Sequence, residues 1–201
     1  MYQIMYQVVI TAIEMFAAAV VLVPVFLILG KVCFHDRKRT CLYLIFALYL
    51  SAVYSVVGLP NVIYARFEPS FYLLPFVGMA SDVKNSILNV VLFIPLGIML
   101  PALWDEFGKM KKTVIFGTGM TLFIEIMQIF TFRLTDINDL ITNIAGTVIG
   151  YVLITAMIKK HLWHVLQKGN IKDVYIISGI TFLTMFFIFP FLNAALWNLV
   201  M

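Results

Sequence analysis

Long apolar runs constrain the fold of this chain more than any other sequence feature. There are six of them, at approximately residues 4–29, 41–58, 86–103, 113–131, 139–158 and 174–197. The 201-residue chain is 63% hydrophobic and 12% charged, whereas soluble domains are roughly half apolar and about a quarter charged. A helix needs about 20 mostly apolar residues to cross a bilayer, and the alternation typical of membrane β-barrels is absent. We therefore predict an all-α, polytopic helical membrane protein with about six transmembrane helices, forming a single domain over residues 1–201.

The basic residues predict the orientation of these helices. Eleven of the fourteen lie in three alternate connectors, namely Lys31, Arg37, Lys38, Arg39, Lys109, Lys111, Lys112, Lys159, Lys160, Lys168 and Lys172. Because connectors rich in Lys and Arg stay in the cytoplasm, we expect both termini of this multi-pass protein to be extracytoplasmic. The same topology accounts for the net charge of +4, so no nucleic-acid partner is expected. Cys33 and Cys41 flank the first basic connector, and the reducing cytoplasm favours free thiols there.

The first apolar run contains a polar stripe at helical spacing, formed by Gln3, Gln7, Thr11 and Glu14. An ionised carboxylate that faces lipid is costly. We therefore expect Glu14 to be protonated, to be paired or to line a cavity.

The long connector at residues 59–85 is rich in aromatic and apolar residues and contains three prolines. Such a segment suits the outer headgroup layer, and the prolines prevent one continuous helix. It is predicted to be either a surface-lying connector or a lid.

Residues 125–151 concentrate polar groups within this apolar sequence. Glu125 and Gln128 are one helical turn apart and share a face, and Asp139 and Asn143 share a face of the next helix. The predicted topology places Glu125 in the outer leaflet, where a buried carboxylate indicates a functional site. A structural ion pair with Arg133, in the connector between the two helices, is the competing interpretation.

Other polar and small residues near this stretch have simpler interpretations. Thr135 or Asp136 can cap the helix that follows, because a short side chain bearing an oxygen accepts from its first free amides. Gly146 and Gly150 have the small-xxx-small spacing that lets membrane helices approach closely. Asn89, near the outer end of its own helix, can point into the bundle.

Taken together, these positions resemble the VanZ-like family of bacterial membrane proteins. The resemblance covers roughly residues 72–158 and rests on Asn89-Val-Val-Leu-Phe93-Ile-Pro95-Leu-Gly97, Glu125-Ile-Met-Gln128, Arg133, Asp136, Asp139, Asn143, Gly146 and Gly150-Tyr151. It implies a protein of the bacterial cell membrane, linked to resistance against teicoplanin, a lipid-bearing glycopeptide that binds cell-wall precursors at the outer surface. The site positions carried over are Asn89, Glu125, Gln128, Arg133, Asp136, Asp139 and Asn143.

One hypothesis for this site is binding. The partner would be a membrane lipid, a lipid-linked cell-wall precursor or the lipoglycopeptide drug. Arg133 would engage an anionic group, while Gln128, Asn143 and Asn89 would hydrogen-bond to sugar or peptide groups.

A second hypothesis is a membrane enzyme that modifies a lipid-linked envelope intermediate, with Glu125 as general base and Arg133 stabilising phosphate charge. The sequence has no P-loop, HExxH, GxSxG or cysteine-rich metal motif. The three histidines, His35, His161 and His164, lie in predicted cytoplasmic connectors, so we expect no metal site and no cofactor. Transport past Glu14 and Glu125 is a third hypothesis, disfavoured because no inverted repeat is visible.

Overall fold

The computed structural model describes residues 2–77, 79, 82–131, 133–158 and 169–200. It is almost entirely helical, which confirms the predicted all-α class. The helices are α1 (Tyr2–Leu29), α2 (Arg37–Val56), α3 (Val83–Leu103), α4 (Met110–Gln128), α5 (Ile137–Ile158), α6 (Ile171–Leu183) and α7 (Phe189–Val200). The chain divides into two compact units, Met1–Ala65 with Lys172–Met201, and Arg66–Ile171.

Each predicted apolar run forms a helix whose ends lie within a few residues of the predicted ones. The sixth run is interrupted, because a π-helical turn at Thr184–Ile188 joins α6 to α7. Among the described residues, five helices are long and apolar enough to cross a membrane, with α6 and α7 together forming one of them. This supports the prediction of a membrane protein.

Helix α4 corresponds to the fourth predicted span and differs from the other five predicted spans, because it is not among the five helices that meet these criteria. Its 19 residues extend about 28 Å, which is enough to cross a hydrocarbon core, but they include Lys111, Lys112 and Glu125. Its outer face is apolar, since Ile115 is 60% exposed and Ile126 is 55% exposed. Membrane crossing by α4 therefore stays a prediction.

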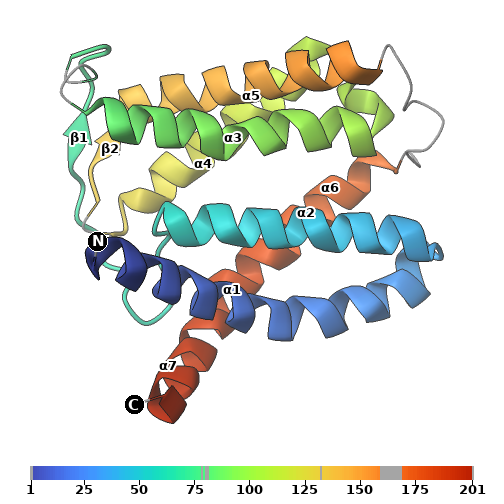
Figure 1. The fold of residues 1–201 in the computed structure, drawn as a ribbon, viewed down its shortest axis with the longest axis horizontal. Helices are drawn as coiled ribbons and strands as arrows, with labels where there is room; N and C mark the ends of the chain where they lie inside the picture. The colour runs from blue at the N-terminus through green and yellow to red at the C-terminus, as the bar shows by residue number, and fades with distance from the viewer. Residues whose placement is uncertain (1, 78, 80–81, 132, 159–168, 201) are drawn as a thin grey trace. The chain divides into compact units, whose positions relative to one another are not determined.

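In the first unit, α1 and α2 form a helical hairpin (Figure 1). A π-helical turn at Gly30–Phe34 ends α1, and His35 follows in the left-handed region with φ of 53°. The Asp36 carboxylate then caps α2 by accepting hydrogen bonds from the amides of Lys38 at 2.8 Å and Arg39 at 3.2 Å. These contacts satisfy backbone donors that a helix start otherwise leaves free.

Glu14 has the environment predicted for it. The Ser55 hydroxyl donates a hydrogen bond to its carboxylate, and Glu14 lines a cavity of about 140 Å³ together with Tyr54 and Asn61. The Glu14 carboxyl group therefore has a hydrogen-bond partner, Ser55, and also lines a cavity. The side chains of the other stripe residues, Gln3, Gln7 and Thr11, lie outside those that the structure describes.

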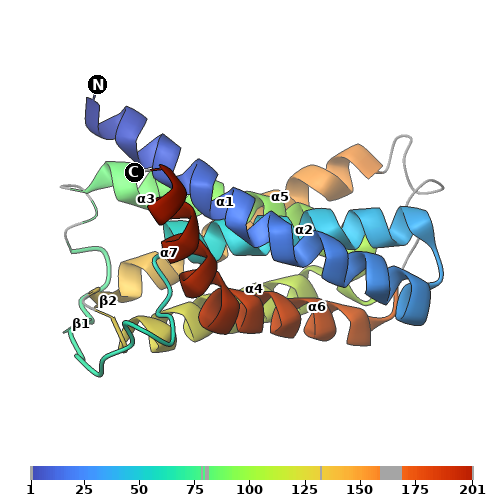
Figure 2. The same cartoon turned by 90° about the horizontal axis from the view of Figure 1, so that it is seen from below.

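In the second unit, α3 and α5 run side by side in the same direction (Figures 1 and 2). A Cβ atom at Gly146 or Gly150 would collide with a main-chain carbonyl oxygen of α3, at Val90 or Ile94, and one at Gly97 would collide with a carbonyl of α5. The predicted packing role of Gly146 and Gly150 is thus confirmed. Because the two helices are parallel, both begin at the same end of the unit, where α4 ends.

Candidate ligand-binding site

Glu125 lies in the last turn of α4 and is buried, with 6% of its surface exposed. Its carboxylate accepts a hydrogen bond from the amide of Asp136 at 3.1 Å, and its main-chain carbonyl accepts one from the Thr135 hydroxyl at 3.2 Å. Both contacts join the end of α4 to the residues that lead into α5. The second also satisfies one of the carbonyls that a helix C-terminus leaves free.

Four charged residues that the sequence predicts for the site lie close together at the end of α4, namely Glu125, Arg133, Asp136 and Asp139. Asp139, Asp136 and Arg133 all lie close enough to act electrostatically on the Glu125 carboxyl group. Asp139 also forms a side-chain hydrogen bond with Asn89 of α3. The second unit therefore assembles three carboxylates and one guanidinium at the end where α3 and α5 begin.

Asp136 is the cap that the sequence predicts for α5. It directly precedes Ile137, the first residue of the helix, and its carboxylate accepts from the amide of Asn138 at 2.8 Å. The helix N-terminus also favours a negative charge at this position. Asp82 occupies the same place before α3 and accepts from the side-chain amide of Asn85 at 2.6 Å.

A cleft of about 230 Å³ opens between these two helix starts. We call it the acidic cleft, and it is lined by Tyr72, Val77, Met79, Asp82, Asn85, Ser86, Leu134, Asp136, Asn138 and Asp139. Three of these side chains are carboxylic acids and two are carboxamides. The lining therefore offers many hydrogen-bond acceptors beside apolar surface.

The connector at residues 59–85 forms one wall of the acidic cleft. Its short strand β1 (Phe71–Tyr72) pairs in parallel with β2 (Thr135–Asp136). Asn138 holds the next turn, because its side-chain oxygen accepts from the Phe76 amide at 2.7 Å and its side-chain nitrogen donates to the Val77 carbonyl at 3.2 Å. The connector is thus tied to the start of α5 by backbone and side-chain hydrogen bonds.

Phe76 has an uncommon backbone conformation in this turn, with φ of 64°. Left-handed φ values are unfavourable for bulky residues and persist where surrounding contacts impose them. The hydrogen bond from its amide to Asn138 is such a contact. The Phe76 side chain is 70% exposed, so the turn presents an aromatic ring at the surface.

Two of the predicted ligand residues are buried in the helix bundle. Asn143 is 3% exposed, and its side-chain nitrogen donates to the Thr121 hydroxyl at 2.9 Å. This hydrogen bond joins α5 to α4 one turn below Glu125. Gln128 is 4% exposed at the end of α4.

The seven predicted site residues therefore divide into groups. Asp136 and Asp139 line the acidic cleft. The other five are not among the described residues that line it, and they are Asn89, Glu125, Gln128, Arg133 and Asn143. Asn89 and Glu125 nevertheless contact the two that do. Arg133 is exposed beside them.

Sequence reasoning missed Asp82 and Asn138 as parts of this site. Asp82 occupies the N-cap position of α3 without a side-chain capping hydrogen bond. A topology that makes α3 and α5 parallel could have indicated that Asp82 and Asp136 lie at the same end. The part of Asn138 depends on the connector folding back from more than sixty residues upstream. Nothing in its local sequence signals that contact.

No histidine or cysteine is among the described residues that line the acidic cleft. His161 and His164 fall outside the described residues, and His35 belongs to the first unit. Within the described part of the chain, no group of three or more His, Cys, Asp or Glu side chains is arranged to hold a metal ion. Cys33 and Cys41 are exposed free thiols, as predicted.

Comparison with known proteins identifies the family. The VanZ/LLP1 family matches residues 40–164, which is more than half of the chain. The chain belongs to the VanZ/LLP1 family. Protein VanZ of Enterococcus faecium is 30% identical to it over 165 residues, which cover 80% of this chain and 94% of that protein. No solved structure matches the chain.

The VanZ/LLP1 match extends beyond the predicted core of residues 72–158, since it begins in α2. It contains all seven predicted site residues and the whole acidic cleft. α1, α6 and α7 lie outside it. The acidic cleft is therefore built from the part of the chain that is matched to the family.

Proposed function

We propose that this VanZ-family chain lowers the susceptibility of a bacterial cell to teicoplanin-type lipoglycopeptides by binding a ligand in the acidic cleft. The ligand is a lipid-linked cell-wall precursor or the lipoglycopeptide itself. The protein acts in the cytoplasmic membrane, with both termini and the acidic cleft on the outer side. The observation that carries this proposal is the convergence of Asp82, Asp136 and Asp139 on one cleft.

The lining of the acidic cleft determines which ligand groups fit. Carboxylate and carboxamide oxygens accept hydrogen bonds, so the complementary groups are donors such as amide N–H, sugar hydroxyl or ammonium. Tyr72, Val77 and Leu134 add apolar surface for a ring or a lipid segment. Arg133, exposed beside the carboxylates, supplies a guanidinium for an anionic group of the same ligand.

A membrane enzyme is the second candidate function, and the burial of Glu125 beside Asp139 favours it. A desolvated carboxyl group can act as a general base. However, the Glu125 carboxylate accepts a hydrogen bond from the Asp136 backbone, and Glu125 is not among the described residues that line the acidic cleft. We therefore assign Glu125 a positioning role, which is to hold Asp136 at the cleft.

The test is a comparison of variants in a susceptible host at matched expression. Teicoplanin susceptibility and surface binding of labelled teicoplanin would be measured for wild type, Asp139→Asn, Glu125→Gln and Glu68→Gln. A hydrogen bond to a charged group contributes about 1.5–3 kcal/mol, so Asp139→Asn is expected to weaken ligand binding roughly 10- to 100-fold and to restore susceptibility. Glu68→Gln is the matched control, since Glu68 is exposed on the same connector and does not line the cleft.

The outcomes separate the two candidate functions and the two ligands. Glu125→Gln retains hydrogen-bonding oxygen and is expected to keep most of the protection, whereas complete loss with Glu125→Gln alone would favour the enzyme. Drug retained at the surface by wild type but not by Asp139→Asn would identify the drug as the ligand. Resistance without drug retention would identify the precursor. Wild-type protein that leaves susceptibility unchanged would refute the resistance function.

A further inference from the structure

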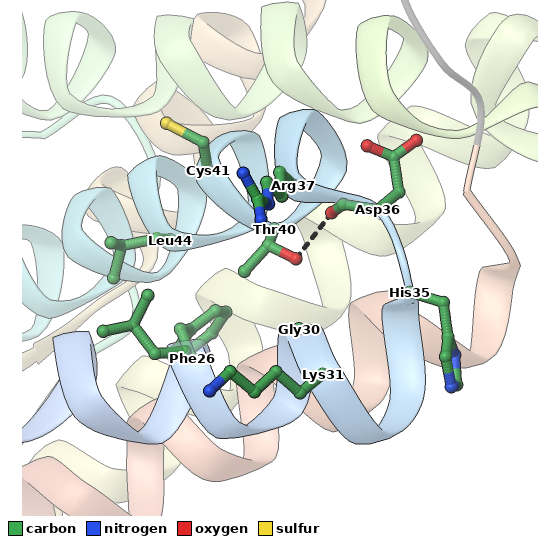
Figure 3. A pocket seen from close by; sticks show the side chains of 10 residues that line it. Phe26, Gly30, Lys31, His35, Asp36, Arg37, Thr40, Cys41 and Leu44 are labelled. Atoms are coloured by element: carbon green, nitrogen blue, oxygen red, sulfur yellow. Dashed lines mark hydrogen bonds between the residues drawn. The ribbon is translucent and has the colours of Figure 1, made fainter.

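The first unit contains a larger cavity between α1 and α2, at the end where the hairpin turns (Figure 3). Its volume is about 580 Å³, and it is lined by Phe26, Leu27, Gly30, Lys31, His35, Asp36, Arg37, Thr40, Cys41 and Leu44. We call it the hairpin pocket. A space of this size accommodates part of a lipid or another small molecule.

Charge and apolar surface are ordered along the hairpin pocket. On α1, Leu27 lies one turn deeper than Lys31, which is about 6 Å, and on α2, Leu44 lies two turns deeper than Arg37, which is about 10 Å. Both walls therefore pass from a basic group near the hairpin turn to aliphatic side chains further along the helices. A phospholipid presents its groups in the same order, with the phosphate outermost and the acyl chains beneath it.

The single acidic side chain of the lining does not cancel these positive charges. The Asp36 carboxylate is engaged by the amides of Lys38 and Arg39, and it is turned away from the pocket interior in Figure 3. Lys31 and Arg37 line the pocket from its two walls, and in Figure 3 the Lys31 side chain runs along α1 while the Arg37 side chain lies over α2 beside Thr40. The mouth of the hairpin pocket is thus positively charged.

Gly30 and Thr40, which both line the hairpin pocket, pack closely against each other. A Cβ atom at Gly30 would lie 2.6 Å from the Thr40 hydroxyl oxygen. That hydroxyl donates to the Asp36 carbonyl at 2.7 Å. The two helices are therefore in close contact at Gly30 and Thr40.

We propose that the hairpin pocket binds one anionic phospholipid, whose phosphate contacts Lys31 and Arg37 and whose upper acyl chain lies against Phe26, Leu27 and Leu44. This site is independent of the acidic cleft, and its ligand belongs to the membrane rather than to the cell wall. The positive charges of Lys31 and Arg37 favour an anionic headgroup, and the apolar side chains of the lining favour a phosphate that carries an acyl chain. The bound lipid joins α1 to α2 at their turn.

The two free cysteines provide an internal comparison for the test. Cys41 lines the hairpin pocket, whereas Cys33 is not among its lining residues, and both are exposed. Cys33→Ser and Cys41→Ser variants would each leave one thiol, in protein reconstituted in phosphatidylcholine vesicles with or without phosphatidylglycerol. The rate of alkylation by N-ethylmaleimide, a neutral reagent, would then be measured as the phosphatidylglycerol fraction rises.

We expect phosphatidylglycerol to slow alkylation of Cys41 and to leave Cys33 unaffected. Lys31→Gln with Arg37→Gln is expected to raise the phosphatidylglycerol needed for half-protection roughly thirtyfold, because each basic residue at an anionic surface contributes about a factor of five. Lys109→Gln with Lys111→Gln removes the same charge from the second unit, and we expect it to change nothing. Binding of phosphatidylglycerol to the intact protein, measured by native mass spectrometry, should fall in the first double variant alone.

Several results would overturn this proposal. They are equal protection of Cys33 and Cys41, protection that survives in the Lys31→Gln and Arg37→Gln double variant, and protection by soluble glycerol phosphate in neutral vesicles. Protection that follows protein concentration rather than lipid composition would indicate a second copy of the chain in the pocket, and would equally refute the lipid.

Discussion

Replacing Asn138 tests whether the connector at residues 59–85 is held at the acidic cleft by this side chain. Asn138 is 5% exposed and makes two side-chain hydrogen bonds to the connector, one with the Phe76 amide at 2.7 Å and one with the Val77 carbonyl at 3.2 Å. A typical hydrogen bond contributes about 1 kcal/mol. Asn138→Ala should therefore destabilise the closed connector by about 2 kcal/mol, which raises its opening equilibrium roughly thirtyfold.

Hydrogen exchange of the Phe76 amide measures this opening directly, because the Asn138 oxygen is its acceptor. We expect exchange at Phe76 to accelerate roughly thirtyfold in Asn138→Ala. Asn138→Asp keeps the oxygen that accepts from Phe76 and loses the nitrogen that donates to Val77. Its loss of free energy for closing the connector should therefore be about half that of Asn138→Ala.

Asn61→Ala is the matched control for this experiment. Asn61 likewise makes two side-chain hydrogen bonds to the backbone, but within its own turn, where its side-chain oxygen accepts from the Ile63 and Tyr64 amides at 3.1 Å each. Its replacement should leave Phe76 exchange unchanged. Unaltered exchange at Phe76 in Asn138→Ala would show that other contacts hold the connector and would refute the reasoning.

Three further predictions follow from the helix contacts and the topology. Gly150→Ala places a methyl group against a main-chain carbonyl of α3, and it should lower the free energy of unfolding in detergent by about 1–3 kcal/mol. Gly119→Ala is the control, because Gly119 has open space around it, and it should be neutral or stabilising by up to about 1 kcal/mol. Equal effects of the two substitutions would contradict the close approach of α3 and α5. The hydrogen bond between Asn143 and Thr121 should give a coupling of roughly 0.5–1.5 kcal/mol in a double-mutant cycle of Asn143→Ala with Thr121→Val, and additive losses would show that it does not stabilise the bundle. A reporter fused after Met201 should be active only outside the cytoplasm, and a cytoplasmic signal would refute the predicted orientation.

Local sequence was sufficient to predict the helices and several of their contacts. Apolar runs of membrane-spanning length mark the helices because the bilayer leaves backbone polar groups no other partner than the chain itself. The spacing of Gly146 and Gly150 alone predicts that they are packing residues, and the place of Asp136 before an apolar run predicts a cap. Each of these features depends on residues within a few turns of one another.

The composition of the acidic cleft was only partly predictable. The sequence indicates Asp136 and Asp139 but neither Asp82 nor Asn138, because the role of Asp82 depends on which helix starts lie side by side and that of Asn138 on the connector that returns to it. The family resemblance implies that Asn143 binds a ligand, and this stays a prediction, while the structure shows its interhelical hydrogen bond with Thr121. Periodicity indicates which face a residue occupies, but not whether protein or ligand meets that face.

By itself, the sequence determined the class of the protein and the positions of its helices, because apolar length, capping and glycine spacing act through short-range physics. Only the tertiary structure decided that the connector returns to α5, that α3 and α5 begin together, and that the α1–α2 hairpin encloses a basic, partly apolar pocket. Those features arise from contacts between residues far apart in the chain, and their partners are selected by packing of the folded helices rather than by local pattern.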